Sequence, residues 1–292
     1  MSTADDLELV IDPRARKAGD ISVARVLPYV HRRAVGPFLF FDHMGPIALA
    51  EGEHHDVRPH PHIALATVTY LFAGEIVHRD SLGSVQAIKP GAINWMTAGR
   101  GIVHSERPPP AHAGDTMHGL QLWCGLPLAH EEAEPAFDHY PAEVLPETMI
   151  DGAIVRVLAG EAFGLRSPVA TLSRLFYVDI EARRDAQIEL PEYPERAAYA
   201  VSGTMRLGTD AYDARERHML VFKPDRTVCL ELDAGTRCVL LGGEPLDGPP
   251  RRMYWNFVSS SAERIEQAKA DWRERRFPAI PGDDVEYIPL PE

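Results

Sequence analysis

Short runs of β-forming residues, separated by turn sequences, are the feature of this chain that most restricts its fold. Residues 64–71, 76–79 and 85–88 are rich in β-branched and large apolar side chains. Residues 73–75 (AGE) and 89–92 (KPGA) separate these runs and are typical of turns. Turns at intervals of roughly eight to twelve residues, without helical periodicity, indicate a sandwich or barrel. The pattern therefore predicts an all-β fold for the first half.

Two pairs of potential metal ligands, each spaced two residues apart, lie in this region. His60 and His62 form the first pair, and His104 and Glu106 form the second. Residues i and i+2 of a strand point to the same face, so each pair would project both side chains to one side. If both strands face inward, three imidazoles and one carboxylate converge, a set that divalent Fe, Cu, Ni, Mn or Zn accepts. The spacing therefore predicts a mononuclear metal centre.

The second half repeats the first in outline. Residues 199–203 (YAVSG) match residues 70–74 (YLFAG) in type and spacing, which suggests an internal duplication with a period near 130 residues. On that register the positions of the four predicted ligands are taken by Glu189, Pro191, Asp233 and Gly235. We therefore expect the second copy to lack metal ligands of this type.

Composition places a domain boundary between the two copies. Residues 126–146 are rich in Glu, Ala and Pro, which suits a surface linker better than a core element. We expect an N-terminal metal-binding domain at residues 1–135 and a C-terminal domain at residues 136–292. Near the end, Ser260 to Glu263 fit a capping box, and apolar residues then follow at helical spacing. This predicts one helix at residues 262–275, docked on the second barrel.

Charge and hydropathy exclude several classes of protein. The formal charge of −13 and the scattered basic residues argue against direct nucleic-acid binding. The N-terminal residues contain no signal-peptide core, and no run reaches the ~18 apolar residues of a spanning helix. We therefore expect a cytoplasmic protein that does not bind membranes, with a monomer as the default state. Three cysteines are too few for a disulfide framework, and only a Cys229–Cys238 bridge stays open.

Four ordered blocks of the first half carry a family resemblance. They are GPFLFFDHMGP (36–46), DVRPHPH (56–62), VTYLFAGEIVHRDSLGS (68–84) and NWMTAGRGIVHSE (94–106). Together they resemble the pirin family of the cupin superfamily, and the similarity extends over most of the chain. The resemblance implies a bicupin, in which two jelly-roll-like β-barrels are followed here by the short C-terminal helix. It also implies one metal in the N-terminal barrel, held by His60, His62, His104 and Glu106.

The resemblance favours Fe(II), with Ni, Cu, Mn and Zn as alternatives, and it leaves three functions open. Some pirins are similar to quercetin 2,3-dioxygenases, which implies an Fe(II)-dependent dioxygenase acting on a flavonol-like or enediol small molecule. Others are described as regulators, which implies a non-enzymatic iron-containing redox sensor that binds a transcriptional or metabolic protein partner. A Zn- or Mn-dependent isomerase or hydrolase is a third reading.

The general base of such an enzyme is not fixed by the sequence. Most pirins carry a Gly-aromatic-Glu segment after the His-Pro-His motif, whereas Ala66 stands in place of that carboxylate here. Glu106 is the catalytic candidate, as a base as well as a ligand, and His43 and Glu75 are alternatives. Residues 254–261 (YWNFVSSS) also depart from the family pattern, which marks a subgroup.

Overall fold

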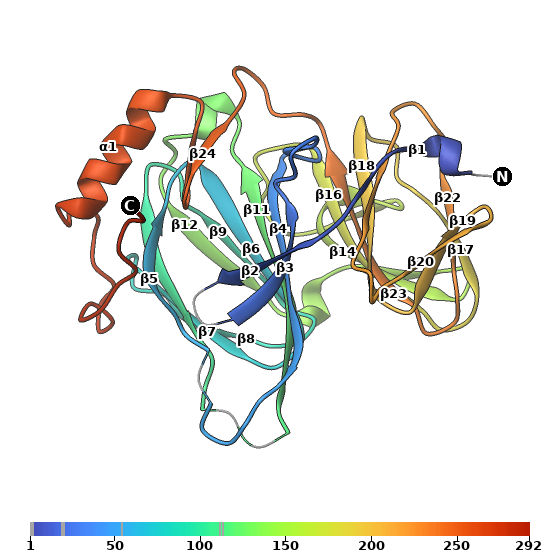
Figure 1. The fold of residues 1–292 in the computed structure, drawn as a ribbon, viewed down its shortest axis with the longest axis horizontal. Coiled ribbons are helices and arrows are strands. Elements are labelled where there is room, and N and C mark those ends of the chain that lie inside the picture. The colour runs from blue at the N-terminus through green and yellow to red at the C-terminus, as the bar shows by residue number, and fades with distance from the viewer. Residues whose placement is uncertain (1–2, 19–20, 54, 111, 113) are drawn as a thin grey trace. The chain divides into compact units, whose positions relative to one another are not determined.

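The computed structural model describes residues 3–18, 21–53, 55–110, 112 and 114–292, and most of the ribbon is β-strand (Figure 1). The chain divides into two compact units. The histidine unit comprises Ala15–Val23, Phe41–Ala142 and Leu246–Glu292, and the apolar unit comprises Met1–Arg14, Ala24–Phe40 and Glu143–Pro245. Whereas composition suggested one cut after residue 135, contacts assign each end of the chain to the unit built mainly from the other half.

Two antiparallel sheets build most of the histidine unit. The larger has the order β12 (Ala136–Tyr140), β9 (Ile93–Thr97), β6 (Leu65–Ala73), β11 (Thr116–Gly125), β4 (Phe38–Ala48), β3 (Ile21–Leu27) and β2 (Arg14–Ala18). The smaller has the order β5 (Val57–His62), β10 (Ile102–Arg107), β7 (Ile76–Asp80) and β8 (Val85–Ile88). A hairpin of β24 (Arg252–Tyr254) and β25 (Phe257–Ser259) follows near the C-terminus. The predicted all-β class with a cupin fold is confirmed.

The apolar unit repeats this arrangement. Its larger sheet has the order β1 (Leu7–Ile11), β21 (Met219–Phe222), β18 (Glu195–Ser202), β23 (Arg237–Gly243), β16 (Leu175–Ala182), β14 (Ala153–Ala162) and β13 (Glu147–Ile150), with β15 (Leu165–Arg166) beside β14. Its smaller sheet has the order β17 (Ala186–Glu189), β22 (Cys229–Leu232), β19 (Thr204–Leu207) and β20 (Asp210–Asp213). Short 3₁₀ turns lie at Ala4–Asp6, Leu128–His130 and Ala142–Val144.

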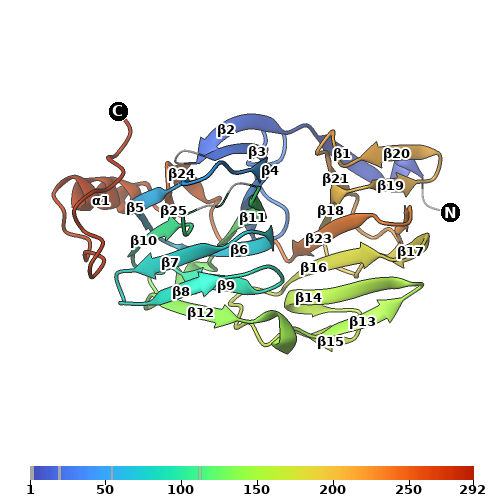
Figure 2. The same ribbon diagram turned by 90° about the horizontal axis from the view of Figure 1, so that it is seen from below.

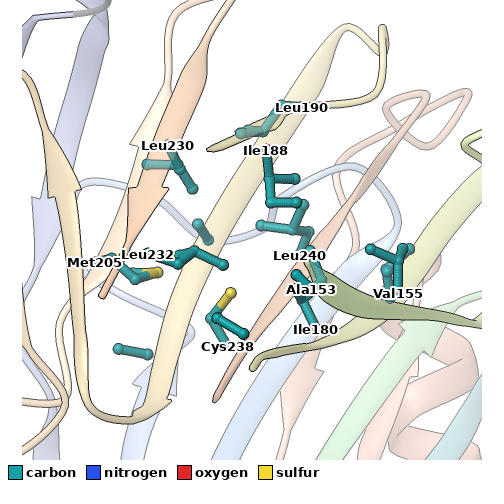
Figure 3. Packing of buried hydrophobic residues seen from close by; sticks show 14 of the residues in the cluster. Ala153, Val155, Ile180, Ile188, Leu190, Met205, Leu230, Leu232, Cys238 and Leu240 are labelled. Atoms are coloured by element: carbon teal, nitrogen blue, oxygen red, sulfur yellow. The ribbon is translucent and has the colours of Figure 1, made fainter. Parts of the chain in front are cut away.

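The smaller sheet of the apolar unit faces a continuous apolar core (Figure 3). Ile188 pairs with Leu230 in this sheet, His60 pairs with His104 in the smaller sheet of the other unit, and all four side chains are buried. The register that placed Glu189 and Asp233 at the ligand positions is wrong. If Glu189 and Asp233 stood at the positions of His60 and His104, they would pair across the two strands, but Glu189 pairs with Cys229.

The cysteines take part in packing and form no bridge. Cys238 is buried in the core of the apolar unit, and Cys124 is buried in the histidine unit. Both are free thiols, as is Cys229. The Cys229–Cys238 bridge that the sequence left open is therefore absent.

The C-terminal helix α1 (Ala262–Arg273) has the predicted start but not the predicted partner. Ser261 caps it by accepting a hydrogen bond from the backbone N–H of Arg264. Its buried residues are Ile265, Ala268 and Trp272. They pack in one cluster with Ile63, Val103, Phe257 and Ile280 of the histidine unit. The expectation that it docks on the second barrel is thus wrong. No helix among the described residues is long and apolar enough to cross a membrane.

Candidate metal centre

Strand pairing brings three of the four predicted ligands together. His60 lies opposite His104 across the β5–β10 pair, and His62 lies opposite Ile102. Among the described residues, one ligand atom from each of His60, His62 and His104 lies within 4.8 Å of those of the other two. The ring centroids of His60 and His104 are 4.3 Å apart. The i, i+2 spacing therefore does place these imidazoles around one point.

Burial keeps the three imidazoles neutral. His60 is 6% exposed, and His62 and His104 are each 1% exposed. Burial lowers the pKa of His60 to about 4, although the carbonyl of Arg58 raises it in part. Burial also lowers the pKa values of His62 and His104 well below the usual value, and the neighbouring imidazoles lower them further. Neutral imidazole is the form that binds a metal ion.

Hydrogen bonds at the rings leave nitrogens available for a metal. The Nδ1 of His60 lies 2.8 Å from the carbonyl oxygen of Arg58, and the Nδ1 of His62 lies 3.2 Å from that of Asn256. A carbonyl oxygen only accepts, so both Nδ1 atoms carry the proton and both Nε2 atoms keep a lone pair. The Nε2 of His104 is buried and has no hydrogen-bond partner among the described residues. This donor set fits a divalent transition-metal ion.

Glu106 lies beside this group but is not part of the cluster within 4.8 Å. The hydroxyl of Thr69 lies 3.2 Å from its Oε1 and 2.8 Å from the Oε1 of Gln121, so two acceptors compete for the one hydroxyl proton. Gln121 also bonds to the Glu106 carboxylate. Burial raises the pKa of Glu106, and the neighbouring His78 together with these hydrogen bonds lowers it only in part. A bulge in the β5–β10 ladder separates the pairing of Glu106 from that of His104. Its role as a fourth ligand stays a prediction.

The surroundings of the triad include residues that sequence reasoning passed over. Trp123 on β11 meets the ring of His62 edge-on at 5.1 Å. His78 lies with its Nδ1 3.4 Å from the Nδ1 of His104. His78 and Asp80 are themselves two residues apart on β7 and hydrogen-bonded at 2.9 Å. The same-face argument used for the ligand pairs could therefore have found them.

The two alternative base candidates have other partners. The Nε2 of His43 lies 2.8 Å from the Nε2 of His118, and the two rings are stacked. Glu75 forms an ion pair with Lys89 at 3.6 Å, and the Lys89 side chain is 71% exposed. The hydrogen bond of His43 and the ion pair of Glu75 described here are both made to side chains outside the triad. Glu106 is therefore the base candidate that the geometry favours.

Comparison with known proteins gives the family. The Pirin family model matches residues 20–124, and the model of the pirin C-terminal cupin domain matches residues 176–278. A pirin-like protein of Caulobacter vibrioides is 50% identical, covering 98% of this chain and all of the relative. The chain belongs to the pirin family. Mouse pirin is 34% identical over 83% of this chain and 86% of its own length.

A solved structure extends the likeness of this pirin to its three-dimensional fold. The crystal structure of quercetin 2,3-dioxygenase from Acinetobacter baumannii superposes with a TM-score of 0.92 at 34% identity. The match covers 99% of this chain and 96% of that one. The resemblance to the pirin family that the four sequence blocks carry is thus confirmed.

The C-terminal segment of this pirin lies beside β5 (Figures 1 and 2). It is hydrogen-bonded to both strands that carry the predicted ligands. Asp283 accepts hydrogen bonds from Ser105, at 2.6 Å, and from Arg107, at 2.8 and 2.9 Å. Ser105 stands between two of the predicted ligands on β10. The N–H of Ile288 donates to the carbonyl of Pro59, the residue before His60. The end of the chain therefore helps to fix the strands that hold the triad.

Replacing Asp283 with asparagine is expected to loosen this attachment at neutral pH. Although burial raises the pKa of Asp283, its bonds to Arg107 and Ser105 hold it below the usual value. A carboxyl with a lowered folded-state pKa stabilises the protein above its unfolded-state pKa, and this contribution is lost as pH falls through the folded-state value. We expect Asp283→Asn to cost about 1.5–3 kcal/mol at pH 7 and progressively less as pH falls through the lowered folded-state pKa of Asp283. Proteolysis of the C-terminal segment across this range measures it.

The matched control for this variant is Asp284→Asn, because Asp284 is the exposed neighbour of Asp283. This control should cleave like the parent at every pH. Equal protection of the Asp283→Asn variant and the parent at pH 7 would show that the ion pair does not hold the segment.

Proposed function

We propose that this pirin is a metal-dependent dioxygenase of the quercetin 2,3-dioxygenase type, with Fe(II) held by His60, His62 and His104. The observation that carries the proposal is the convergence of three buried imidazoles, one of which has an Nε2 without a hydrogen-bond partner in the described part of the chain. The likeness to the Acinetobacter baumannii enzyme supports it. A flavonol-like or enediol small molecule, with an acidic hydroxyl beside a carbonyl, suits such a site.

A bound divalent ion would supply a Lewis-acidic centre that favours the ionised form of the substrate hydroxyl. The protein would then have to remove the hydroxyl proton. Glu106 is suited to this because its carboxylate is partly buried, its pKa is raised, and the side chains of Thr69 and Gln121 contact it. Trp123 and the strands of the barrel would limit access of water to the reacting atoms.

Anaerobic loading with Fe(II), followed by O₂ uptake with a panel of flavonols and enediols, tests the activity. We expect O₂ consumption that depends on both metal and substrate. If the loaded protein consumes no O₂ with any member of the panel, the dioxygenase proposal is wrong. Binding of a protein partner that changes with the oxidation state of iron would then favour the regulator. Metal analysis of protein from its native cells identifies the physiological ion.

Replacing Glu106 with glutamine is expected to show whether Glu106 acts as a general base or as a metal ligand. The amide keeps the shape and the bond to Thr69 but cannot take a proton, so kcat/KM should fall by roughly 10²–10⁴-fold. Because three imidazoles remain, the Kd for Fe(II) should rise by no more than about tenfold. Glu132→Gln, at a side chain that is 54% exposed, is the control and should leave both quantities unchanged. Unchanged kcat/KM in Glu106→Gln would exclude it as the base.

A further inference from the structure

A chain of three side chains leads from a buried carboxylate to the metal triad. The Oδ2 of Asp80 lies 2.9 Å from the Nε2 of His78, and the Nδ1 of His78 lies 3.4 Å from the Nδ1 of His104. Asp80 is fully buried, and the side chain of His78 is 4% exposed. Strand pairing keeps all three residues close, because Asp80 lies opposite His104 and His78 lies opposite Glu106 across the β7–β10 pair.

The hydrogen bonds of Asp80 determine which residue donates in the Asp80–His78 hydrogen bond. Its Oδ1 accepts from the backbone N–H groups of Leu82, at 2.9 Å, and Ser84, at 3.0 Å. Although burial raises the pKa of Asp80, the bonds from His78 and Ser84 outweigh it, and the pKa is lowered. Asp80 is therefore an ionised carboxylate that only accepts hydrogen bonds. The proton between Asp80 and His78 consequently belongs to the Nε2 of His78.

The donor and acceptor in the His78–His104 hydrogen bond can be assigned next. The Nδ1 atoms of His78 and His104 share one hydrogen bond, so only one of them carries a proton. A proton on the Nε2 of His104 would have no acceptor among the described residues, so His104 carries its proton on Nδ1 and donates to His78. This leaves a lone pair on the buried Nε2 of His104. Phe137 holds the ring of His78 in place by stacking on it, with centroids 4.1 Å apart and planes 8° apart.

The comparison with the other two imidazoles shows why such a chain matters. His60 and His62 each meet a backbone carbonyl oxygen at Nδ1, and that oxygen fixes their tautomer. His104 meets a side chain instead, and an imidazole can present either a donor or an acceptor. The tautomer of His104 is therefore the only one of the three that a change of side chain can reverse.

We propose that Asp80 and His78 are positioning residues of the metal centre, which set the tautomer of His104 so that its Nε2 faces the ion. This inference rests on the proposed metal-binding function. It assigns no contact with substrate to either residue. Its consequence is that a substitution of identical size at Asp80 should impair metal binding.

Asp80→Asn tests the proposal, because it should reverse the tautomers without changing shape. The Oδ1 position still has to accept from Leu82 and Ser84, so the amide NH₂ faces His78 and donates to it. His78 then carries its proton on Nδ1 and donates to His104, whose own proton moves to Nε2. We expect the Kd for Ni²⁺ alone to rise about 10–100-fold in the full-length protein.

Nitrogen-15 NMR of the imidazoles provides a readout that needs no metal. In the full-length chain stripped of metal with chelator, we expect His104 to be protonated on Nδ1 in the parent and on Nε2 in Asp80→Asn. A merely structural role for Asp80 would not move this signature. Identical His104 tautomers in the two proteins, or an unchanged Kd for Ni²⁺, would overturn the proposal.

A second substitution, His78→Phe, keeps the proposal testable if the Asp80→Asn variant does not fold. His78→Phe keeps a ring that can stack on Phe137 but removes the acceptor for His104, so we expect both tautomers of His104 and a smaller rise in Kd. If His104 stays wholly protonated on Nδ1 in this variant, the chain does not set its tautomer. Asp138→Asn, at the exposed neighbour of Phe137, is the matched control and should resemble the parent. If the parent itself binds no Ni²⁺, the proposed function fails, while the NMR comparison still decides the inference.

Discussion

Replacing His104 with alanine is expected to weaken binding of divalent metal by at least about 100-fold. Residues that only support a ligand typically contribute 10–100-fold to metal affinity, and the loss of a ligand itself should exceed this. The two remaining imidazoles, His60 and His62, leave the ion with too few protein donors for a stable site. Calorimetric titration with Ni²⁺ and metal analysis after gel filtration measure the effect.

The control for this experiment is His218→Ala. His218 is the only histidine beyond His139 in the sequence, and its side chain is 24% exposed and paired with Asp12. This variant should retain one ion per chain with the affinity of the parent. If His104→Ala also retains one ion per chain, the metal is bound elsewhere and the triad is not its site. Circular dichroism of each variant checks that the fold is kept.

The triad could be predicted from the sequence because strand geometry is local. In a strand, two histidines spaced i, i+2 share a face whatever the rest of the chain does, and β5 shows this for His60 and His62. The pairing of β5 with β10 is not local, but the second i, i+2 pair and the short intervening strands made it a reasonable expectation. The resemblance to pirins then pointed to the same residues.

The surroundings of Glu106 and His104 could not be predicted in the same way. Thr69 and Gln121 meet Glu106 from other strands, and no spacing in the sequence relates them to it. His78 was missed although it shares the two-residue spacing with Asp80, because a buried histidine more often has a structural role. Which residues contact a ligand depends on strand register, and register is set by the whole sheet.

The C-terminal helix shows the same limit at the level of packing. Its apolar stripe and its cap at Ser261 follow from local sequence, and both are found. The surface on which the helix packs cannot be predicted from local sequence, because an apolar face indicates that it is covered but not by which residues. Residues such as Ile63 and Val103 cover it, and they lie on or beside the ligand strands. The helix thus supports the metal centre rather than the apolar unit.

The two units illustrate how one strand arrangement serves two purposes. The histidine unit places buried imidazoles between its sheets, and this costs stability unless their hydrogen bonds or a metal compensate. In the smaller sheet of the apolar unit, paired residues such as Ile188 and Leu230 pack in a hydrocarbon core instead (Figure 3). We therefore expect metal binding to stabilise the histidine unit selectively.

Replacing Arg251 with alanine is expected to destabilise the histidine unit by about 3–5 kcal/mol, the usual effect of removing one partner of a buried ion pair. Its Nε lies 2.6 Å from Oε1 of Glu131, and the two side chains are 2% and 7% exposed. Glu131 also accepts hydrogen bonds from Ser259 and Ser260 at 2.9–3.1 Å. Without the guanidinium, a buried carboxylate would lack its counter-charge. Urea unfolding monitored by tryptophan fluorescence measures the loss.

The same variant should weaken metal binding, since the serines that Glu131 holds adjoin the hairpin that bears Asn256. The carbonyl of Asn256 accepts from His62, so movement of this hairpin would release the ring. Lys89→Ala is the matched control in the same unit, because Lys89 is 71% exposed and its pairing with Glu75 should contribute no more than about 1 kcal/mol. Equal unfolding free energies for the two variants would mean that the buried pair does not hold the hairpin. A stability loss in Arg251→Ala with unchanged Ni²⁺ affinity would instead separate the hairpin from the site.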